Sequence, residues 1–415
     1  MLVFFYAKEN LKTNITQESN IVYEHEFRGV TDEEENSQIP LDKIYLTTPN
    51  DFGKHRKYLE LSKQDPNLLR AINPKDIVES QFLPKNITFK NIDEELGDLK
   101  QQQELKIAIL NGMSNAIGDH LIGMNALNLL HEHLQRYYDK RNINITLFQL
   151  NPARLNPITD KWSFTSKTYI LPTTLAALST FDLFYDFGGL LALKGFQDLN
   201  MIDFFLNALS INAESVAAER KRIQFYPSEM GRDTSKMLMR QVRKKAGKKP
   251  IMLFHNKSTS PIRSMDNKNA ERIIRDIVKE SDYFVISAID TGFKCENFMN
   301  LHKFSREIDQ FASIISLVDA IVTVDTCTYH FADSFNIPTI ALFSSIAPEL
   351  RCKYYPLVKG VLLCKKDSIL YGNHKFELNE DKSNQELVDQ ASEETAKIWK
   401  RLTAKRILRE LSKIT

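Results

Sequence analysis

The chain has 415 residues, of which 42% are hydrophobic and 26% are charged. This composition is typical of a soluble globular protein, and no stretch approaches the ~20 apolar residues that a bilayer-spanning helix needs. The 55 basic residues nearly balance the 53 acidic ones, so the overall charge gives no reason to expect nucleic acid as a partner. At this length a single core is unusual, and we expect two or three domains.

Residues 1–104 are predicted to form an N-terminal α+β extension. Short β-rich runs at residues 1–6, 21–27 and 43–48 predict strands, and residues 58–72 predict a helix. The start of the chain reads as a strand rather than a signal peptide, because its apolar run is short. No catalytic pattern occurs in this extension, and its role cannot be derived from the sequence.

Residues 105–247 are predicted to form a first Rossmann-like domain. The buried strand at 106–110 leads into a glycine-containing loop, Asn111 to Gly118, and then into a helix that starts at Asp119. Two interpretations of Asp119 are open: it caps the helix, or it faces a cleft as a general base. Asn111, Gly112 and Gly118 lie in this loop.

Two further strands are expected in this domain, at residues 143–147 and 183–187, the second followed by the pair Gly188-Gly189. Such a pair lets the backbone approach a ligand closely, although it is a weak signal alone. The Arg- and Lys-rich residues 213–249 predict a solvated helix and a linker.

Residues 248–380 are predicted to form a second Rossmann-like domain. Strands are expected at 250–254 and 282–287, with a polar loop after the first that carries Lys257 and Arg263. Two strand–loop–helix halves with polar groups at the strand ends describe two Rossmann-like domains that face a cleft. Lys257 and Arg263 then point into that cleft, unless they are ordinary surface charges.

The stretch from 321 to 343 is the most informative part of this domain. It predicts a strand at 321–324, a polar turn, a short helix and a second strand at 339–343. The turn carries Asp325, Thr326, Thr328 and His330. A turn of this kind at the carboxyl end of a parallel strand suits a diphosphate, and the alternative is a capped core helix.

Residues 381–415 predict a closing helix over 384–413 with an apolar face and a basic end. This helix either lies on an anionic membrane surface or packs across the two domains with its charges in solvent. The four cysteines lie far apart in the last third and form no C-x-x-C pair, which indicates reduced thiols in a cytoplasmic protein. Their spacing does not call for a metal, although a metal site built from them stays open; they are Cys295, Cys327, Cys352 and Cys364.

Together, the 111–119 segment, the loop to Arg263 and D-T-C-T-Y-H-F-A-D followed by I-P-T-I-A-L-F resemble glycosyltransferase family nine. That family includes the ADP-heptose–lipopolysaccharide heptosyltransferases, and the resemblance covers roughly residues 105–363. It implies a GT-B fold, in which two Rossmann-like domains face each other, and inverting sugar transfer that needs no metal or other cofactor.

The resemblance also assigns roles. The Gly-Asp carboxylate that is the family's proposed base falls on Asp119, and a basic residue of the second domain falls on Arg263, with Met265 where a tryptophan is usual. The family's diphosphate loop falls on Asp325 to His330, with Cys327 in place of glycine. A donor-side glutamate of the family corresponds to Glu296, and the acceptor-side loop falls on Asn111, Gly112 and Gly118. The predicted donor-binding residues are therefore Lys257, Arg263, Glu296, Asp325, Thr326, Cys327, Thr328 and His330.

The sequence thus predicts a cytoplasmic glycosyltransferase that uses a nucleotide-sugar, with ADP-heptose as the donor that the resemblance implies. The acceptor is a glycan, a lipid-linked or lipopolysaccharide-core sugar, or a protein hydroxyl. Two alternatives stay open: a sugar-nucleotide-binding protein without turnover, and a membrane-associated assembly factor whose basic C-terminal helix contacts the inner membrane.

Overall fold

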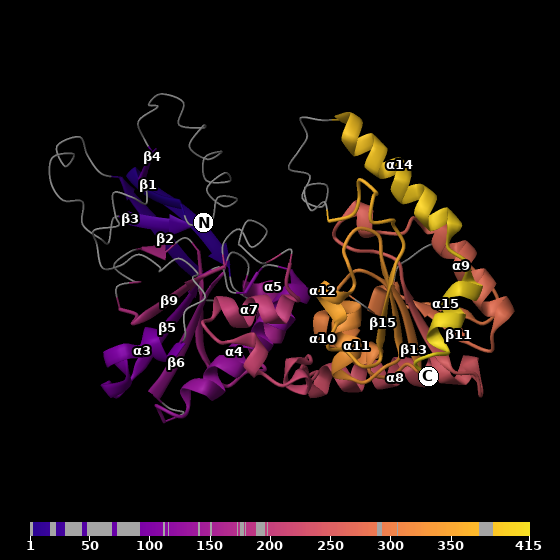
Figure 1. Ribbon diagram of the computed structural model, residues 1–415, viewed down its shortest axis with the longest axis horizontal. Coiled ribbons are helices and arrows are strands. Elements are labelled where there is room, and N and C mark those ends of the chain that lie inside the picture. Colours follow the sequence, from indigo (N-terminus) through magenta and orange to yellow (C-terminus); the bar gives the residue numbers. More distant parts are fainter. Residues whose placement is uncertain are drawn as a thin grey trace. The chain divides into compact units, whose positions relative to one another are not determined.

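The computed structural model describes residues 3–16, 22–29, 44–47, 69–72, 92–110 and most of 113–415, with gaps that include 188–195, 289–292 and 373–384. The chain forms two compact units, Met1–Leu193 with Ile202–Ser215, and Lys194–Met201 with Val216–Thr415. Each unit contains its own parallel sheet flanked by helices (Figure 1). The predicted α/β class with two Rossmann-like halves is confirmed, whereas the predicted domain ranges stay a prediction.

The N-terminal extension contributes four strands to a five-stranded antiparallel sheet of the first unit, and β8 supplies the fifth. Its strands are β1 (Val3–Thr16), β2 (Val22–Gly29), β3 (Ile44–Thr47), β4 (Leu69–Ile72) and β8 (Thr173–Thr174). The three predicted strands occur, but the helix predicted over 58–72 is wrong at its end, because 69–72 pairs with β1 as a strand. Residues 58–68 of that prediction lie outside the described residues.

The parallel sheet of the first unit has the order β7-β6-β5-β9. Numbered along the chain, this is the order 3-2-1-4 with which doubly wound sheets begin. Its elements are β5 (Leu105–Leu110), α4 (Ile117–Leu134), β6 (Ile143–Gln149), α5 (Pro152–Thr159), β7 (Thr165–Ile170) and β9 (Leu183–Asp186). Three short helical segments flank it in this unit: α3 (Ile92–Leu96), η2 (Gly97–Gln101) and α7 (Met201–Ala208).

The second unit contains a six-stranded sheet in the order β12-β11-β10-β13-β14-β15, with every pair parallel. Along the chain this is 3-2-1-4-5-6, the order of dinucleotide-binding Rossmann folds. The strands are β10 (Ile251–His255), β11 (Phe284–Ser287), β12 (Phe298–Asn300), β13 (Ala320–Val324), β14 (Thr339–Phe343) and β15 (Val358–Leu362). The chain reverses its direction of winding between β10 and β13.

Helices cover both faces of this sheet, which explains why its strands read as continuous apolar runs. On one face, α9 (Asn267–Glu280) shares a buried cluster with alternate strand residues such as Met252, Val322 and Leu342. On the other face lie α8 (Glu229–Ala246), α10 (Ile308–Ile315) and α11 (Thr328–Ser334) (Figure 1). A four-residue helix, α12 (Glu349–Cys352), precedes β15.

The C-terminal segment differs from its prediction, because it forms two helices, α14 (Gln385–Arg401) and α15 (Ala404–Leu411). Thr403 starts the second helix by accepting a hydrogen bond from the Arg406 amide at 3.3 Å. Arg272 of α9 donates to the carbonyls of Trp399 and Leu402, each at 3.0 Å, and so completes the end of α14.

The apolar face of these two helices is buried in the core of the second unit. Trp399, Leu402, Ile407 and Leu411 are each no more than 2% exposed and belong to the α9 cluster. This burial removes the apolar face on which the predicted membrane contact of this segment depended. No helix in the described part of the chain is long and apolar enough to cross a membrane.

Candidate functional site

The point at which the second sheet reverses its winding brings two of the predicted loops together. His255 ends β10, and Asp325 directly follows β13, the neighbouring strand. Ligands of open parallel sheets bind outside the carboxyl ends of strands at such a reversal. The loop with Lys257 and Arg263 and the turn from Asp325 to His330 therefore flank the position at which this fold class holds its ligands.

The loop after β10 is held by a dense set of hydrogen bonds. Asn256 and Met265 bond twice, through Met265 N to Asn256 O at 2.8 Å and Asn256 Nδ2 to Met265 O at 3.0 Å. The Ser264 hydroxyl accepts from the Ser258 amide at 2.9 Å, and Ser344 at the end of β14 donates to Ile262 O at 2.7 Å. Met265 is fully buried. The loop is thus fixed at both ends and in its middle, so Arg263 is presented from a rigid support.

Arg263 lies beside Asp325. Its Nη1 is 3.4 Å from both the carboxylate Oδ2 and the main-chain oxygen of Asp325, and its side chain is 21% exposed. The other oxygen of Asp325 accepts from the Tyr329 hydroxyl at 2.9 Å. Burial, followed by the Asp325 charge, raises the pKa of Tyr329 well above its usual value, so this phenol stays a donor. Asp325, buried between two donors, is placed to orient Arg263.

A histidine that the sequence analysis did not single out lies in the same place. His255 Nδ1 is 2.6 Å from the Thr328 hydroxyl, and this bond joins the end of β10 to the first residue of α11. Burial lowers the pKa of His255 to about 4, so the ring is neutral at neutral pH. The signal in the sequence was a polar residue at the end of a buried strand, directly before the predicted loop.

His330 is more deeply placed than a phosphate-binding cation would be. It is 3% exposed, and its Nδ1 lies 2.8 Å from the Tyr355 hydroxyl. Burial, and secondarily the nearby Arg351 charge, lowers the pKa of His330 to about 3. With its ring neutral at neutral pH, His330 offers a ligand only a hydrogen bond, and its place among the donor-binding residues stays a prediction.

The remaining predicted donor residues differ in placement. Lys257 is half-buried and makes no ion pair with any residue that the structure describes. Thr326 and Cys327 are half-buried at the start of α11, and Cys327 has φ −56° and ψ −16°, which any residue adopts, so this turn needs no glycine. Glu296 is exposed in the turn before β12, which β11 and β10 separate from β13 in the sheet. These donor assignments stay predictions.

In the first unit, Asp119 lies in the first turn of α4, after β5 and at the reversal between β5 and β9. It is not the N-cap, which is Ala116; it is the third residue of the helix and accepts from the Ser114 hydroxyl at 3.3 Å. Gly118 is the second residue of the helix. Asn111 and Gly112 lie outside the described residues, as does the Gly188-Gly189 pair.

The loop before α4 packs closely on that helix. Met113 is buried, has φ +62°, and lies against Gly123, one turn beyond Asp119. A Cβ added to Gly123 would lie 2.4 Å from the Met113 Cβ. Glycine at this position therefore lets the loop approach the helix, and the contact sets the place of Asp119 relative to the strand end.

The four cysteines are free thiols. Burial raises the pKa of Cys352 to about 12 and that of Cys364 to about 11, which disfavours the thiolates that metals bind. Among the described residues, no group of three or more His, Cys, Asp or Glu side chains is placed to hold a metal.

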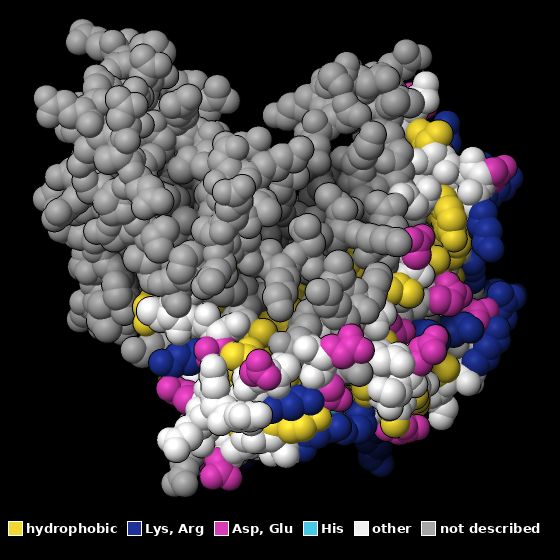
Figure 2. Space-filling view, turned by 60° about the vertical axis from the view of Figure 1, so that its left-hand side comes forward, with side chains coloured by type: hydrophobic (Ala, Val, Ile, Leu, Met, Phe, Trp, Pro, Cys, Tyr) yellow, Lys and Arg dark blue, Asp and Glu magenta, His cyan; other side chains and the backbone are white. Residues whose placement is uncertain are grey.

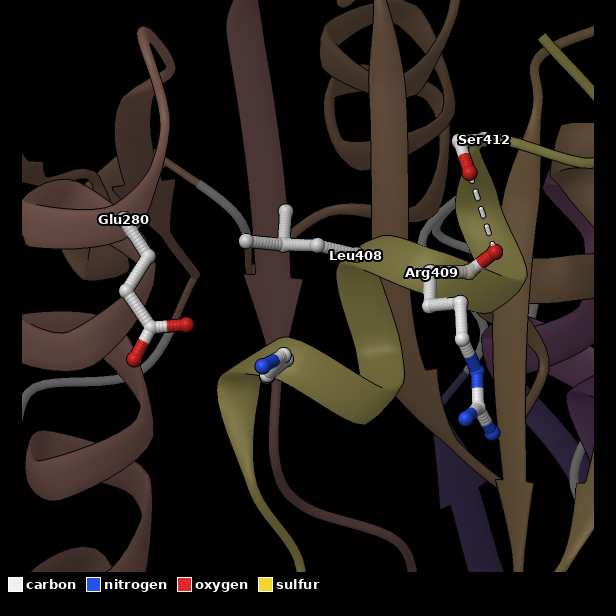
Figure 3. Close-up of a pocket in the computed structure, with 5 residues that line it drawn as sticks. Glu280, Leu408, Arg409 and Ser412 are labelled. Atoms are coloured by element: carbon white, nitrogen blue, oxygen red, sulfur yellow. Dashed lines mark hydrogen bonds between the residues drawn. The ribbon is translucent and has the colours of Figure 1, made fainter.

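A separate cavity of about 600 Å3 lies between α9 and α15, lined by Glu280, Lys405, Leu408, Arg409 and Ser412. Figure 3 shows Leu408 extending from α15 toward Glu280, and the Ser412 hydroxyl donates to Arg409 O at 3.0 Å. Glu280 ends α9 just before β11, so this cavity lies toward the amino edge of the sheet. No predicted site residue lines it, and it is not the donor site.

Comparison with known protein families tests the predicted resemblance to glycosyltransferase family nine. Residues 300–368, which contain β13, α11, β14 and β15, match the model of glycosyltransferase family 9 (heptosyltransferase). The predicted resemblance to this family is confirmed. The enzyme class that it implies, glycosyltransferase, is confirmed with it.

Solved structures similar to the chain include three bacterial enzymes. ADP-heptose lipopolysaccharide heptosyltransferase II of E. coli is 15% identical, with 71% of this chain and 99% of that chain covered and a TM-score of 0.48. A family 9 glycosyltransferase of Veillonella parvula is 11% identical, with 76% and 98% covered and a TM-score of 0.48. The iron-containing dodecameric glycosyltransferase TibC of enterotoxigenic E. coli is 12% identical, with 75% and 79% covered and a TM-score of 0.44. At these identities and scores the similarity says nothing about the substrate of this chain. No curated protein matches it.

Proposed function

We propose that the chain transfers a sugar from a nucleoside diphosphate donor, with ADP-heptose as the donor, to an acceptor hydroxyl, with inversion at the anomeric carbon and without a metal. The observation that carries this proposal is the family match over residues 300–368, because it contains the turn from Asp325 to His330. That turn lies at the reversal of a Rossmann-type sheet, where nucleotides bind in this fold class.

The proposed donor site places the diphosphate near Arg263, Lys257 and the turn that carries Thr326. A guanidinium forms two parallel hydrogen bonds to phosphate oxygens, and such charge-assisted bonds are stronger than neutral ones. The bonds from Arg263 to Asp325 are long, at 3.4 Å, so the guanidinium can exchange them for shorter bonds to phosphate. Lys257, which has no ion pair among the described residues, supplies a second positive charge.

The proposed reaction needs a base and a stabilised leaving group. Asp119 takes the proton of the acceptor hydroxyl, the hydroxyl oxygen bonds to the anomeric carbon, and the bond from that carbon to the diphosphate oxygen breaks. The electron pair leaves with the nucleoside diphosphate, whose charge is met by Arg263 and Lys257. Asp119 lies in the first turn of α4, where the helix N-terminus stabilises negative charge.

The acceptor is proposed to be a glycan, a lipid-linked or lipopolysaccharide-core sugar, or a protein hydroxyl, as the family resemblance implies. The test is incubation of the full chain with ADP-heptose, UDP-glucose and GDP-mannose, with release of each nucleoside diphosphate measured. Hydrolysis or transfer with ADP-heptose alone supports the proposed donor. Tight ADP binding without turnover, even with an acceptor extract, would indicate a binding protein instead.

A further inference from the structure

The surface of α8 combines exposed apolar side chains with a high density of positive charge. Of the large hydrophobic residues that the structure describes, the three most exposed are Tyr226 at 73%, Met230 at 80% and Met237 at 68%. All three lie within or just before α8. Along the lower edge, where α8 lies in Figure 1, Figure 2 shows yellow apolar side chains beside blue basic ones.

The geometry of α8 places these groups on one side. Met230, Met237 and Lys244 follow each other at seven-residue steps, which is two helical turns, so they form a row. The opposite side, which includes Leu238 and Val242, is buried, and Ser235 donates to Gln310 O of α10 at 3.1 Å. Because the inner side is fixed against α10, the row faces outward from a rigid helix.

Charge is concentrated on the same element. Residues 229–249 contain eight Lys or Arg and two acidic residues, a net charge of +6, whereas the whole chain carries +2. Lys236 pairs with Asp233 at 3.6 Å and Arg243 with Asp319 at 2.9 Å. The other exposed basic side chains make no ion pair with a described residue; they are Arg232, Arg240, Lys244, Lys245 and Lys248.

We propose that the outer face of α8, formed by Met230, Met237, Arg240 and Lys244, binds the anionic surface of a lipid bilayer. Lys and Arg are attracted to anionic headgroups, and methionine side chains between them insert into the boundary between headgroups and acyl chains. This surface is independent of the donor chemistry proposed above, since none of its residues belongs to the donor site.

Other occupants fit the face less well. A symmetric contact between two copies brings two segments of net charge +6 together, which like-charge repulsion opposes. Single-stranded nucleic acid uses aromatic platforms for stacking, whereas the exposed apolar side chains within α8 are methionines and the exposed Tyr226 lies before the helix. The C-terminal helices are also basic, but their apolar side chains are buried, so they have charge without a group to insert.

The test is co-sedimentation of the full chain with vesicles of phosphatidylcholine alone and of equal parts phosphatidylcholine and phosphatidylglycerol. Binding to the anionic vesicles only is expected. Each basic residue near an anionic surface strengthens binding about fivefold, so Arg240→Gln with Lys244→Gln should weaken it by roughly 25-fold. Met230→Ser with Met237→Ser leaves the charge unchanged and should weaken binding about tenfold, corresponding to burial of roughly half of each side chain.

The matched control removes the same charge from exposed positions on the two basic C-terminal helices, with Lys400→Gln in α14 and Lys405→Gln in α15. This variant should bind anionic vesicles within a few-fold of the unchanged chain, and melting temperatures of all variants should agree because the substituted residues are exposed. The proposal is overturned by no binding to anionic vesicles, by equal binding to neutral ones, or by a loss confined to the Lys400 and Lys405 variant. Insensitivity to the methionine change, with tight binding of a single-stranded oligonucleotide, also overturns it, since that describes a polyanion site.

Discussion

Arg263 Nη1 lies 3.4 Å from both Oδ2 and the main-chain oxygen of Asp325, although 62 residues separate the two along the chain. The contact joins the loop after β10 to the turn after β13, the two strands between which the sheet reverses its winding. Asp325 is also bound by Tyr329, so the carboxylate is fixed before it meets Arg263. A buried carboxylate in this position holds the guanidinium in one orientation and lowers the entropy lost when a phosphate binds.

Arg263→Ala is expected to weaken ADP binding by roughly 1.5–3 kcal/mol, the usual value of a hydrogen bond to a charged group. Calorimetry on the unchanged chain and on the variant measures this difference. The matched control is Arg401→Ala, which removes an exposed arginine at the end of α14 and should leave ADP affinity unchanged. Equal affinities of the Arg263 variant and the unchanged chain would count against this placement of the diphosphate.

Gly123→Ala is expected to destabilise the first unit by about 1–3 kcal/mol. The new Cβ meets the Met113 Cβ at 2.4 Å, and overpacking of this kind outweighs the better helix propensity of alanine. Denaturant titration measures the free energy of unfolding. Transfer activity should fall as well, since the loop before Asp119 must move.

A double-mutant cycle isolates the cause of that loss. Met113→Gly removes the Cβ that clashes and suits the positive φ at this position, although it loses buried apolar area. In the Met113→Gly background, Gly123→Ala should therefore cost clearly less than in the unchanged chain. If the losses of stability from the two substitutions simply add, residues 113 and 123 do not interact. The contact between loop and helix then does not set the position of Asp119.

The buried His330 predicts a loss of stability in mild acid. Its pKa is about 3 in the folded chain, below the ordinary value of 6.5, so between these values the unfolded chain binds a proton that the folded chain does not. The free energy of unfolding therefore falls as the pH falls, by about 2 kcal/mol between pH ~6.5 and pH ~5 for this residue alone. His330→Asn, which does not titrate, should show a pH dependence smaller by that amount.

Other titrating groups do not affect this comparison, since they are the same in both proteins. His255, with a pKa of about 4, acts in the same direction as His330. Burial raises the pKa of Asp333 to about 6 despite its pairing with Arg222, so this carboxyl acts in the opposite direction over the same range. Denaturant titrations at several pH values measure the free energy of unfolding of the unchanged chain and of His330→Asn. If this free energy depends on pH equally in both proteins, His330 is not buried in its neutral form.

Local patterns in the sequence predicted the strands and helices that carry the site, but they could not predict features that depend on contacts between distant residues. Within residues 320–343 the pattern changes from a β-branched run to helical spacing and back, and the structure has a strand, a helix and a strand in the same places. The order of the strands, which makes His255 and Thr328 neighbours, is not encoded in any short stretch. Thr403 divides the C-terminal helix because Arg272, 130 residues before Leu402, binds the carbonyls at the break.

The site predictions show the same division between local and long-range information. The first-turn position of Asp119 followed from spacing, but the N-cap proved to be Ala116, because the chain turns before Ile117 rather than at the carboxylate. The lowered pKa of His330 could not be predicted from its own segment, because it depends on burial beside Tyr355 and Arg351, which lie farther along the chain. The residue type determines which chemistry a side chain can perform, whereas packing in the fold determines its protonation state.

The role of Asp119 as the base is tested by Asp119→Asn. Asp119 is the third residue of the helix rather than its N-cap, and the loss of a negative charge near the helix start costs only about 0.3–1 kcal/mol. General-base catalysis typically accounts for ~10²–10⁴ in rate, so single-turnover transfer should fall by that factor. The affinity for ADP should hardly change, since it does not depend on proton transfer.

Ser114→Ala separates the base from its surroundings. It removes the hydroxyl that donates to Asp119 at 3.3 Å and keeps the carboxylate. Because the carboxylate stays in place, the maximal rate of transfer should change by only a few-fold. In Asp119→Asn no ionisation of a base remains, and the acidic limb of the pH–rate profile should disappear. If Asp119→Asn keeps both near-full transfer and that acidic limb, the proton is taken by another group, and the proposed mechanism loses its base while the donor site is unaffected.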